Sequence, residues 1–291
     1  MKKTFHHILF MTAITCGALC AVSCTQKKFN VNGTIANAKD STLYFENMGL
    51  NGPEVLDSVR LGEDGSFAFS EKATDAPEFY RLRVAGQIIN VSIDSTETVN
   101  VKAQYPNMAS QYEVTGSENC SKIKELTLMQ MALQQQIQDI AQNLNLNSQT
   151  INDSLQKVVE AYKDKVKMNY IYKEPMKASS YFALFQTINV GNGSLLIFNP
   201  RTSAEDVKVY AAVATSWDTY YPKAERGANL HNIAIEGMKD VRIIQNNQRK
   251  MLQATEAATS GLIDIALTDH RGVLRKLTDL KGKVVVLDFH I

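Results

Sequence analysis

The sequence has few cysteines, and most of them lie at its beginning. There are four in 291 residues, and Cys16, Cys20 and Cys24 all precede residue 25. Cys120 is therefore the one thiol left if the first two are removed with a leader and the third is modified, and no intramolecular disulfide can then form. The fold must be held by its hydrophobic core, for which 44% apolar residues provide the material.

An excess of charge of one sign is also lacking. Lys and Arg number 31 and Asp and Glu 30, which gives a formal net charge of +1. Without the first 23 residues, which contain two lysines, 29 basic residues face 30 acidic ones. Nucleic-acid-binding domains carry clustered basic residues on one face, so we expect no nucleic-acid partner.

Motifs for cofactors and metals are absent from the sequence. His231, His270 and His290 lie far apart, and none has the His-x-x-x-His spacing of a metal site. We also find no glycine-rich phosphate loop, no serine elbow and no readable pair of carboxylates. The sequence predicts no cofactor, no metal ligand and no catalytic residue.

The N-terminus has the pattern of a secretory signal peptide. Lys2 and Lys3 precede an apolar stretch from Ile8 to Val22, which is too short and too weakly flanked for a transmembrane helix. The stretch ends in small residues at Ala21-Val22-Ser23. We therefore expect residues 1–23 to be removed on export.

The residues around the expected cleavage point resemble a lipobox, in which small residues precede a cysteine that is acylated. Cys24 fits this pattern, although Ala21 replaces the more usual leucine, and Cys20 fits it less well because bulky Leu19 precedes it. We expect an acyl anchor on Cys24, a tether over residues 24–28 and a membrane of the cell envelope as partner. No acidic run follows Cys24, which favours the periplasmic face of the outer membrane. The alternative is an ordinary cleaved signal peptide.

Residues 29–116 have an all-β pattern. Short runs rich in β-branched and aromatic residues alternate with turn signals about every ten residues, which is typical of a sandwich or partly open barrel. We expect a turn at Asn51-Gly52-Pro53 and a hairpin at Glu63-Asp64-Gly65. The expected strands, about eight, lie near residues 29–35, 43–45, 55–61, 66–69, 80–84, 88–93, 99–101 and 112–114.

From Ser117 to about residue 256 the apolar period becomes helical. Two stripes separated by a break at 143–147 predict a helical hairpin, with Ile123, Leu126, Met129, Leu133, Ile137, Ile140 and Leu144 in the first, and Ile151, Leu155, Val158, Tyr162 and Val166 in the second. A third helix is expected over 178–188, ending at Gly191-Asn192-Gly193. A capping box of Thr202 and Glu205 predicts a fourth helix to about Tyr220, and a last one spans roughly 232–253.

Residues 257–291 return to a strand period. A strand over 262–267, a turn at 269–272 and a return strand from Val273 lead to a near-continuous apolar run, Val284 to Phe289. Such a run belongs inside a sheet that is covered on both faces. Two or three strands alone are marginal, and an unpaired apolar edge is an aggregation hazard. We expect the run to be the first central strand of a domain that is incomplete in these 291 residues. The alternative is that residues 118–256 cover the strand.

The segment Leu280-Lys281-Gly282-Lys283 followed by Val284-Val285-Val286-Leu287-Asp288-Phe289 resembles the opening of thioredoxin-like domains of the TlpA and AhpC/TSA type. The resemblance covers about 35 residues. It implies the start of a thioredoxin-like domain. With the β and helical patterns before it, we expect an α+β chain with an N-terminal antiparallel β-sandwich, a helical middle region and this C-terminal start. The resemblance also implies a membrane-anchored periplasmic lipoprotein of the thiol-disulfide oxidoreductase type, whose partners are envelope proteins with thiols or disulfides.

Two departures from that family bear on activity. His290 stands where the family has tryptophan, and the chain contains no Cys-x-x-C, whose activated thiolate and resolving thiol carry the chemistry. We therefore expect the 291-residue chain to be redox-inactive. A non-catalytic binding or scaffold lipoprotein acting through the β-sandwich is the alternative, and a peroxiredoxin-like activity is a weaker third possibility.

Three further features have both a functional and a structural interpretation. Cys120, near the start of a predicted helix, is either a reactive thiol or a small semi-buried residue, and nearby Glu118 favours the latter. His290 either lines the cleft of a thioredoxin-like domain or simply ends a strand. Trp217, with Tyr210, Tyr220 and Tyr221, is either a ligand platform or, as helical spacing favours, part of a core.

Overall fold

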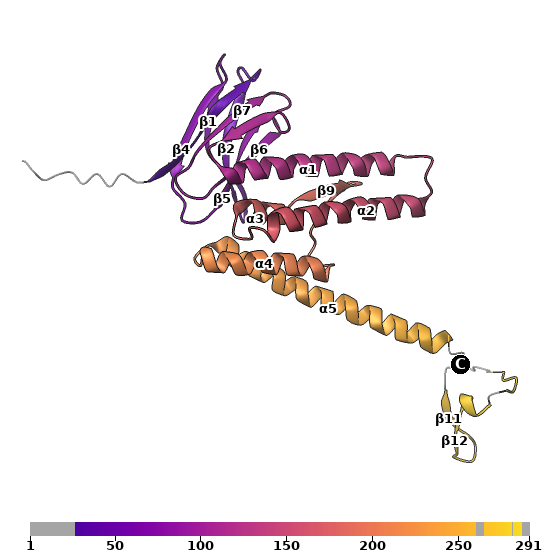
Figure 1. The fold of residues 1–291 in the computed structure, drawn as a ribbon. Coiled ribbons are helices and arrows are strands. Elements are labelled where there is room, and N and C mark those ends of the chain that lie inside the picture. Colours follow the sequence, from indigo (N-terminus) through magenta and orange to yellow (C-terminus); the bar gives the residue numbers. More distant parts are fainter. Residues whose placement is uncertain (1–26, 260–264, 281, 287–291) are drawn as a thin grey trace, which may run out of the picture. The chain divides into compact units, whose positions relative to one another are not determined.

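The computed structural model describes residues 27–259, 265–280 and 282–286. It divides into two compact units, Met1–Ser121 and Lys122–Ile291, and each is described by itself. The first is built from strands and the second mainly from helices (Figure 1). The α+β class predicted from the sequence is confirmed.

Eight strands form two four-stranded sheets in the first unit. One sheet has the order β4-β1-β7-β8 and the other β3-β2-β5-β6. All neighbouring pairs are antiparallel except β1 and β7, which run parallel. The strands are β1 (Lys28–Ala36), β2 (Thr42–Gly49), β3 (Gly52–Arg60), β4 (Ser66–Lys72), β5 (Glu78–Val84), β6 (Gln87–Ile93), β7 (Thr98–Gln104) and β8 (Tyr112–Thr115).

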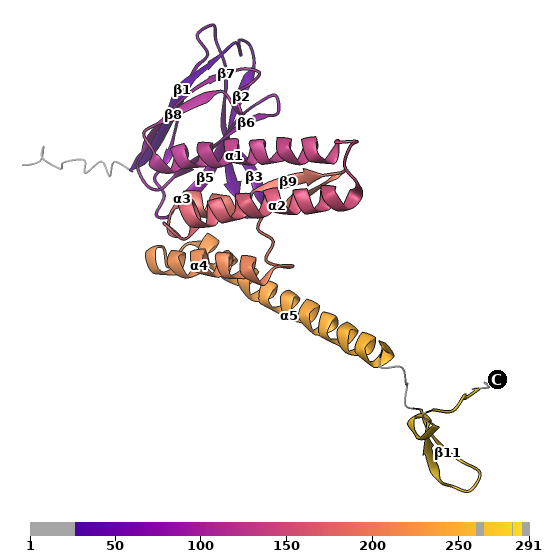
Figure 2. The ribbon, with the colours of Figure 1, turned by 45° about the vertical axis from the view of Figure 1, so that its right-hand side comes forward.

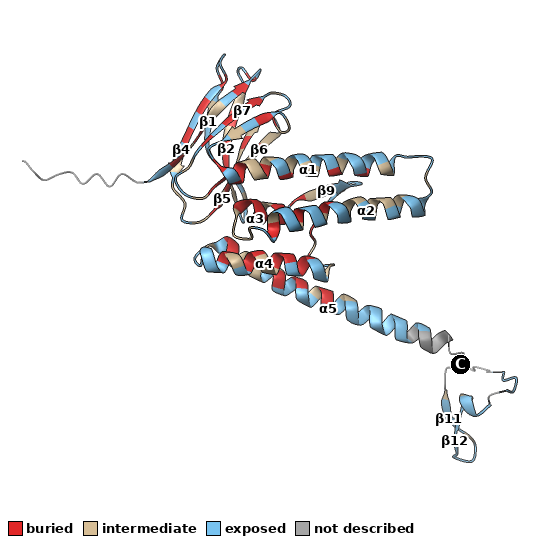
Figure 3. Ribbon diagram, in the orientation of Figure 1, coloured by how far each residue is buried: buried red, intermediate tan, exposed pale blue. Residues whose placement is uncertain are grey.

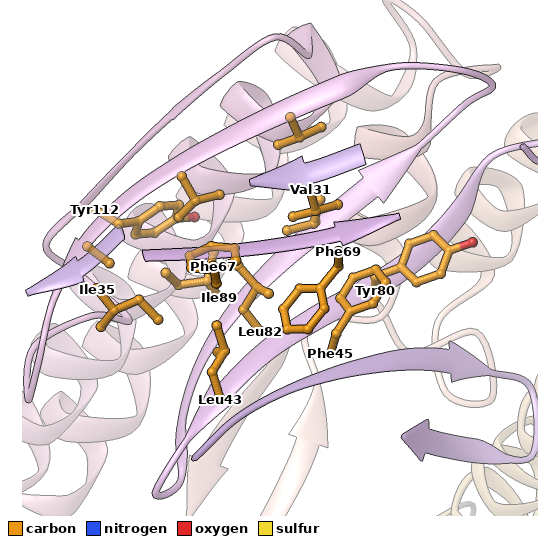
Figure 4. Packing of buried hydrophobic residues seen from close by; sticks show 14 of the residues in the cluster. Val31, Ile35, Leu43, Phe45, Phe67, Phe69, Tyr80, Leu82, Ile89 and Tyr112 are labelled. Carbon is orange, nitrogen blue, oxygen red and sulfur yellow. The ribbon is translucent and has the colours of Figure 1, made fainter. Parts of the chain in front are cut away.

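The two sheets share one hydrophobic core (Figure 4). In β1, β4 and β7 alternate residues point inward, as the period of two requires. Phe45 lies at the centre, because its ring contacts Phe29 and Phe69 of the other sheet and Tyr80 of its own, with ring centroids 6.3, 5.1 and 5.2 Å away. These ring contacts join the two sheets across one core, so the predicted sandwich is confirmed.

Two predicted turns need correction. The first turn lies at Leu50 and Asn51, and Pro53 is not part of it but is the second residue of strand β3, opposite Met48. The turn before β4 does form, with Gly65 at φ +63°, but it is no hairpin, because β3 pairs with β2 whereas β4 pairs with β1. An added Cβ at Gly65 would lie 2.1 Å from the Ile35 carbonyl oxygen. The glycine therefore allows the chain to cross between sheets at close range.

The second unit contains five helices in its described residues, together with a single π-helical turn at Lys167–Ile171. The first helix begins just inside the first unit. The helices are α1 (Glu118–Ala141), α2 (Ser148–Val166), α3 (Ala178–Leu184), α4 (Ala204–Tyr220) and α5 (Glu225–Thr259). Both predicted apolar stripes face inward except at Leu144, which lies beyond the end of α1 and is exposed.

The third helix is shorter than the sequence predicts. It ends at Leu184, and the next residues form the antiparallel hairpin β9 (Thr187–Val190) and β10 (Gly193–Leu196). Gly191, with φ +57°, therefore makes a hairpin turn and does not cap a helix. The alternation of Thr187-Ile188-Asn189-Val190 fits a strand, but four residues were too few to outweigh the helical pattern before them.

Two helix starts also differ from prediction. Ser203, not Thr202, is the N-cap of α4, and its hydroxyl accepts a hydrogen bond from the Asp206 amide at 3.2 Å. Helix α5 begins at Glu225 and ends at Thr259, and is longer than predicted at both ends.

An ion pair connects α2 with the start of α4. The Asp206 carboxylate accepts hydrogen bonds from the Asn199 amide at 2.8 Å and from Lys163 of α2 at 2.6 Å. This partly buried ion pair joins α2 to α4.

The last described residues form a small hairpin. Strand β11 (Ala266–Thr268) pairs with β12 (Leu274–Lys276) around the predicted turn, and a 3₁₀ turn follows at Leu277–Leu280. The Asp269 carboxylate accepts hydrogen bonds from the Arg271 and Val273 amides at 2.9 and 3.0 Å. These bonds lower the pKa of Asp269.

No helix in the described part of the chain has the length and apolar character needed to cross a bilayer.

Candidate functional site

Two of the residues singled out from the sequence, Cys24 and His290, lie outside the described residues. The same holds for the predicted signal peptide and for the second half of the predicted strand 284–289. Lipidation at Cys24 and a cleft-lining role for His290 therefore stay predictions.

Cys120 is buried in the first unit, near the start of α1. Its thiol donates a hydrogen bond to the Ser92 carbonyl oxygen at 3.2 Å and accepts one from the Ser92 amide at 3.4 Å. Burial disfavours the thiolate and raises the pKa of Cys120 to about 11. The side chain links β6 to α1. The contacts therefore favour a structural role for Cys120 over a reactive one.

The histidines that the structure describes form no metal site. His231 contacts the Asp218 carboxylate across the α4–α5 hairpin, and exposed His270 lies in the β11–β12 turn beside Arg271. Within residues 27–259, 265–280 and 282–286, no group of three His, Cys, Asp or Glu residues could hold an ion.

The aromatic residues around Trp217 belong to a core, which is the interpretation that their helical spacing favoured, and not to a ligand platform. Trp217 and Tyr210 are fully buried, and the Tyr210 hydroxyl donates to the Leu184 carbonyl oxygen at 2.7 Å. The Trp217 ring lies 4.9 Å from that of Tyr181. Tyr220 points to solvent. The four aromatic residues therefore present no common face to a ligand.

The apolar residues after the β11–β12 hairpin are exposed. Residues Val284–Val286, which we call the valine segment, are in no strand as far as the structure describes them, and Val284 and Val286 are 97% and 87% exposed. A turn precedes them, in which the Lys283 amide donates to the Leu280 carbonyl oxygen at 3.0 Å and Gly282 has φ +88°. Valine is a strand former, so this segment has the composition of a buried strand without its burial.

Figure 2 shows strand β9 beside the helices α1 and α2. Side chains of α1, α2 and the β9 turn line a groove that the sequence did not reveal. Its volume is about 480 Å³, and its walls include Ile137, Leu155 and Ile188 with the amides of several glutamines. Gln134 of α1 positions β9, because its amide accepts from the Asn189 N–H at 2.7 Å and donates to the Asn189 carbonyl oxygen at 3.1 Å. In the sequence, the signals for the groove were the short alternation at Thr187–Val190 and the glutamines, and the start of β9 was interpreted as the end of a helix.

A partly buried charge cluster on β2 and β5 was also missed. The Glu46 carboxylate accepts hydrogen bonds from both Arg81 and Arg83, and the Arg83 guanidinium also lies 4.4 Å from the centre of the Tyr44 ring. Burial alone would raise the pKa of Glu46, but the hydrogen bonds from Arg83 and Arg81 outweigh it and hold the pKa low. Both Glu46 oxygens are used, so the cluster fixes two strands together.

The comparisons concern mainly the first unit. Residues 29–122 match a family described as a domain of unknown function, DUF4369. This match covers the eight strands of the β-sandwich, apart from the first residue of β1, and the first residues of α1. No curated protein matches the chain. The matched residues 29–122 span the residues 29–116 that the sequence predicts as a β domain and six residues beyond them, Cys120 included.

Proposed function

We propose that this protein is a membrane-anchored periplasmic lipoprotein of the thiol-disulfide oxidoreductase type, in which the DUF4369 domain precedes a thioredoxin-like domain of the TlpA and AhpC/TSA type. The 291 residues supply the anchor, the β-sandwich, the helical unit and the opening hairpin of that domain. They supply no redox dithiol.

The valine segment carries the proposal. Three consecutive valines follow a glycine turn, and at least two of them are almost fully exposed. Burying a valine side chain is worth roughly 1.5–3 kcal/mol, so a native chain that leaves this segment in water gives up several kcal/mol. A thioredoxin-like sheet would pair and cover it. The β11–β12 hairpin and the 3₁₀ turn at Leu277–Leu280 provide the lead into such a strand.

The family match adds independent support. DUF4369 domains are often found in thioredoxin-associated lipoproteins. The order of the parts agrees with that association, since the matched region comes first and the thioredoxin-like segment last. Two separate stretches of the chain therefore favour the same class of protein.

The redox inactivity of these 291 residues follows from their thiols. Exchange needs an accessible thiolate and a second thiol that resolves the mixed disulfide. Cys120 is buried, with a raised pKa, and its hydrogen bonds are made within the fold. Cys16, Cys20 and Cys24 lie at the N-terminus, before the expected mature chain begins or at its lipidated first residue.

Two measurements test this assignment. One is an insulin-reduction assay on the 291-residue chain, and the other is the coding sequence that follows Ile291. The 291-residue chain is expected to reduce insulin no faster than the dithiothreitol blank, with thioredoxin as the active control. A Cys-x-x-C encoded within about ten residues after Ile291 would supply the low-pKa thiol at a helix N-terminus that exchange requires. Turnover by the 291-residue chain refutes the inactivity, and a reading frame without the two cysteines refutes the oxidoreductase assignment.

Non-catalytic binding is the second candidate function, and the groove of the second unit favours it. Its volume of about 480 Å³ lies in the range of small-molecule sites, and apolar walls with a few amides suit an uncharged ligand. The site for binding is then the groove and not the β-sandwich that the sequence suggested. The codons after Ile291 discriminate between the two functions.

A further inference from the structure

Asparagine is followed directly by glycine at three places in the chain, Asn32-Gly33, Asn51-Gly52 and Asn192-Gly193. This pair of residues is chemically unstable where the main chain can bend. The glycine amide nitrogen can attack the side-chain carbonyl carbon of the asparagine, and glycine has no side chain to hinder the approach. The structure places the three pairs in two different environments, and the environment decides which of them can react.

Two of the asparagines lie in the short turns of hairpins. Asn51 is in the two-residue turn that joins β2 to β3, and Gly52 is the first residue of β3. Asn192 is in the two-residue turn that joins β9 to β10, and Gly193 is the first residue of β10. Both asparagines are exposed, and the far end of β9, which leads into the second turn, is pale blue for exposed in Figure 3.

The space around the two turn glycines is open. Apart from the flanking residues, an added Cβ at Gly52 would have no atom within 4 Å, and at Gly193 the nearest atom would be the Val190 carbonyl oxygen at 3.9 Å. Each glycine is at the end of its strand, where the main chain opens at little cost in free energy. The glycine nitrogen can therefore reach the asparagine side chain without displacing a neighbour.

The third pair lies inside β1, where strands on both sides hold it. Gly33 pairs with Phe67 of β4 and with Val101 of β7. An added Cβ at Gly33 would lie 1.8 Å from the Val101 carbonyl oxygen. The main chain cannot bend toward the Asn32 side chain unless the pairing opens, so this pair is an internal control of identical chemistry.

We propose that Asn51 and Asn192 are sites of spontaneous deamidation in the folded protein, and that Asn32 is protected. The glycine nitrogen forms a bond to the side-chain carbonyl carbon, the carbon–nitrogen bond of the side-chain amide breaks, and ammonia leaves with the proton of the glycine amide. The product is a five-membered succinimide ring. Water is the co-reactant of the second step and opens the ring at either carbonyl, which gives aspartate or isoaspartate without oxidation or reduction.

Deamidation changes both the charge and the main chain of the turns. Each event adds one carboxylate, and isoaspartate also adds one methylene to the main chain of a two-residue turn. Residue 192 follows Gly191, which lines the groove of the second unit together with other uncharged residues. A carboxylate at 192 would therefore bring negative charge to the edge of an uncharged groove. The inference does not depend on the proposed redox class.

Peptide mapping by mass spectrometry tests the proposal in the full 291-residue chain. The protein is kept for several weeks in mildly alkaline buffer made with heavy-oxygen water, and a parallel sample is kept in guanidinium chloride at the same pH. Opening of the ring adds one solvent oxygen, so each event during the incubation is marked and separated from deamidation during digestion. The rate is measured at each of the three asparagines.

In the folded chain, deamidation at Asn51 and at Asn192 is expected to be at least about tenfold faster than at Asn32, because the pairing of β1 must open before Asn32 can react. In guanidinium chloride the three rates should agree within about threefold, since no strand then protects Asn32. Equal rates at all three positions in the folded chain would overturn the proposal. So would the absence of deamidation at both turns of the folded chain.

G193A is the matched variant for the chemical step. Gly193 lies outside the left-handed region, and its added Cβ would make only an ordinary contact, so the hairpin should keep its fold. The methyl group hinders the attacking nitrogen and should lower the rate at Asn192 about tenfold, while the rate at Asn51 stays unchanged. An unchanged rate at Asn192 in G193A would overturn attack by the nitrogen of residue 193.

Discussion

Replacing Cys24 with serine is expected to abolish incorporation of labelled palmitate and to move the protein from the membrane fraction to the soluble fraction. Each acyl methylene buried in a bilayer contributes ~0.8 kcal/mol, and two or more chains give stable anchoring. Serine cannot form the thioether. Ala21-Val22-Ser23 still offers the small residues that an ordinary signal peptidase recognises, so the variant is expected to be cleaved and released.

The matched control is Cys20→Ser. Cys20 lies four residues earlier in the same apolar stretch and follows Leu19, so its loss is expected to leave both the label and the membrane fraction unchanged. Labelling of the Cys24→Ser protein, or loss of label in Cys20→Ser, would show that the anchor is on another residue.

Cys120 is expected to resist alkylation in the folded protein. A pKa of about 11, in place of the ordinary value of 9.0, lowers the thiolate fraction at pH 8 by about two orders of magnitude. Burial limits access further. The rate of modification by iodoacetamide, followed by mass spectrometry, should therefore be at least about 100-fold lower in buffer than in guanidinium chloride at the same pH.

The pH dependence of the alkylation rate distinguishes a buried thiol from an activated one. Because burial disfavours the thiolate, the reaction of the folded protein should still be accelerating at pH 10, where that of an ordinary exposed thiol has levelled off. A folded-state rate equal to the denatured rate at pH 8, or a plateau below pH 9, would show an accessible, activated thiol. The structural interpretation of Cys120 would then be wrong.

Periodicity determined how much of the fold could be predicted. The strands of the first unit and the two long apolar stripes were found because each has a clear period of two or 3.6 along many residues. The β9–β10 hairpin was missed because Thr187–Val190 is too short for its alternation to be distinguished from the end of a helix. A hairpin turn and a turn that crosses between sheets also look alike in sequence. The turn between β3 and β4 could therefore not be classified without knowing that the two strands belong to different sheets.

The candidate sites were harder to predict, because they depend on contacts between distant residues. Glu46 is separated from Arg81 and Arg83 by more than thirty positions, and nothing local marks it as their partner. The groove depends on Gln134 of α1 meeting Asn189 of β9. In contrast, the core role of Trp217 followed from helical spacing alone.

Amide hydrogen exchange at Val284–Val286 in the 291-residue chain tests the central claim most directly. These amides are expected to exchange at the rate of an unstructured peptide, and those of Val99 and Val101, in a central strand of the sandwich, on the order of a thousandfold more slowly. Slow exchange of the valine segment, comparable to that of β7, would mean that other residues of the 291-residue chain already pair with the segment and cover it. The proposal that it awaits the rest of a thioredoxin-like sheet would then be contradicted.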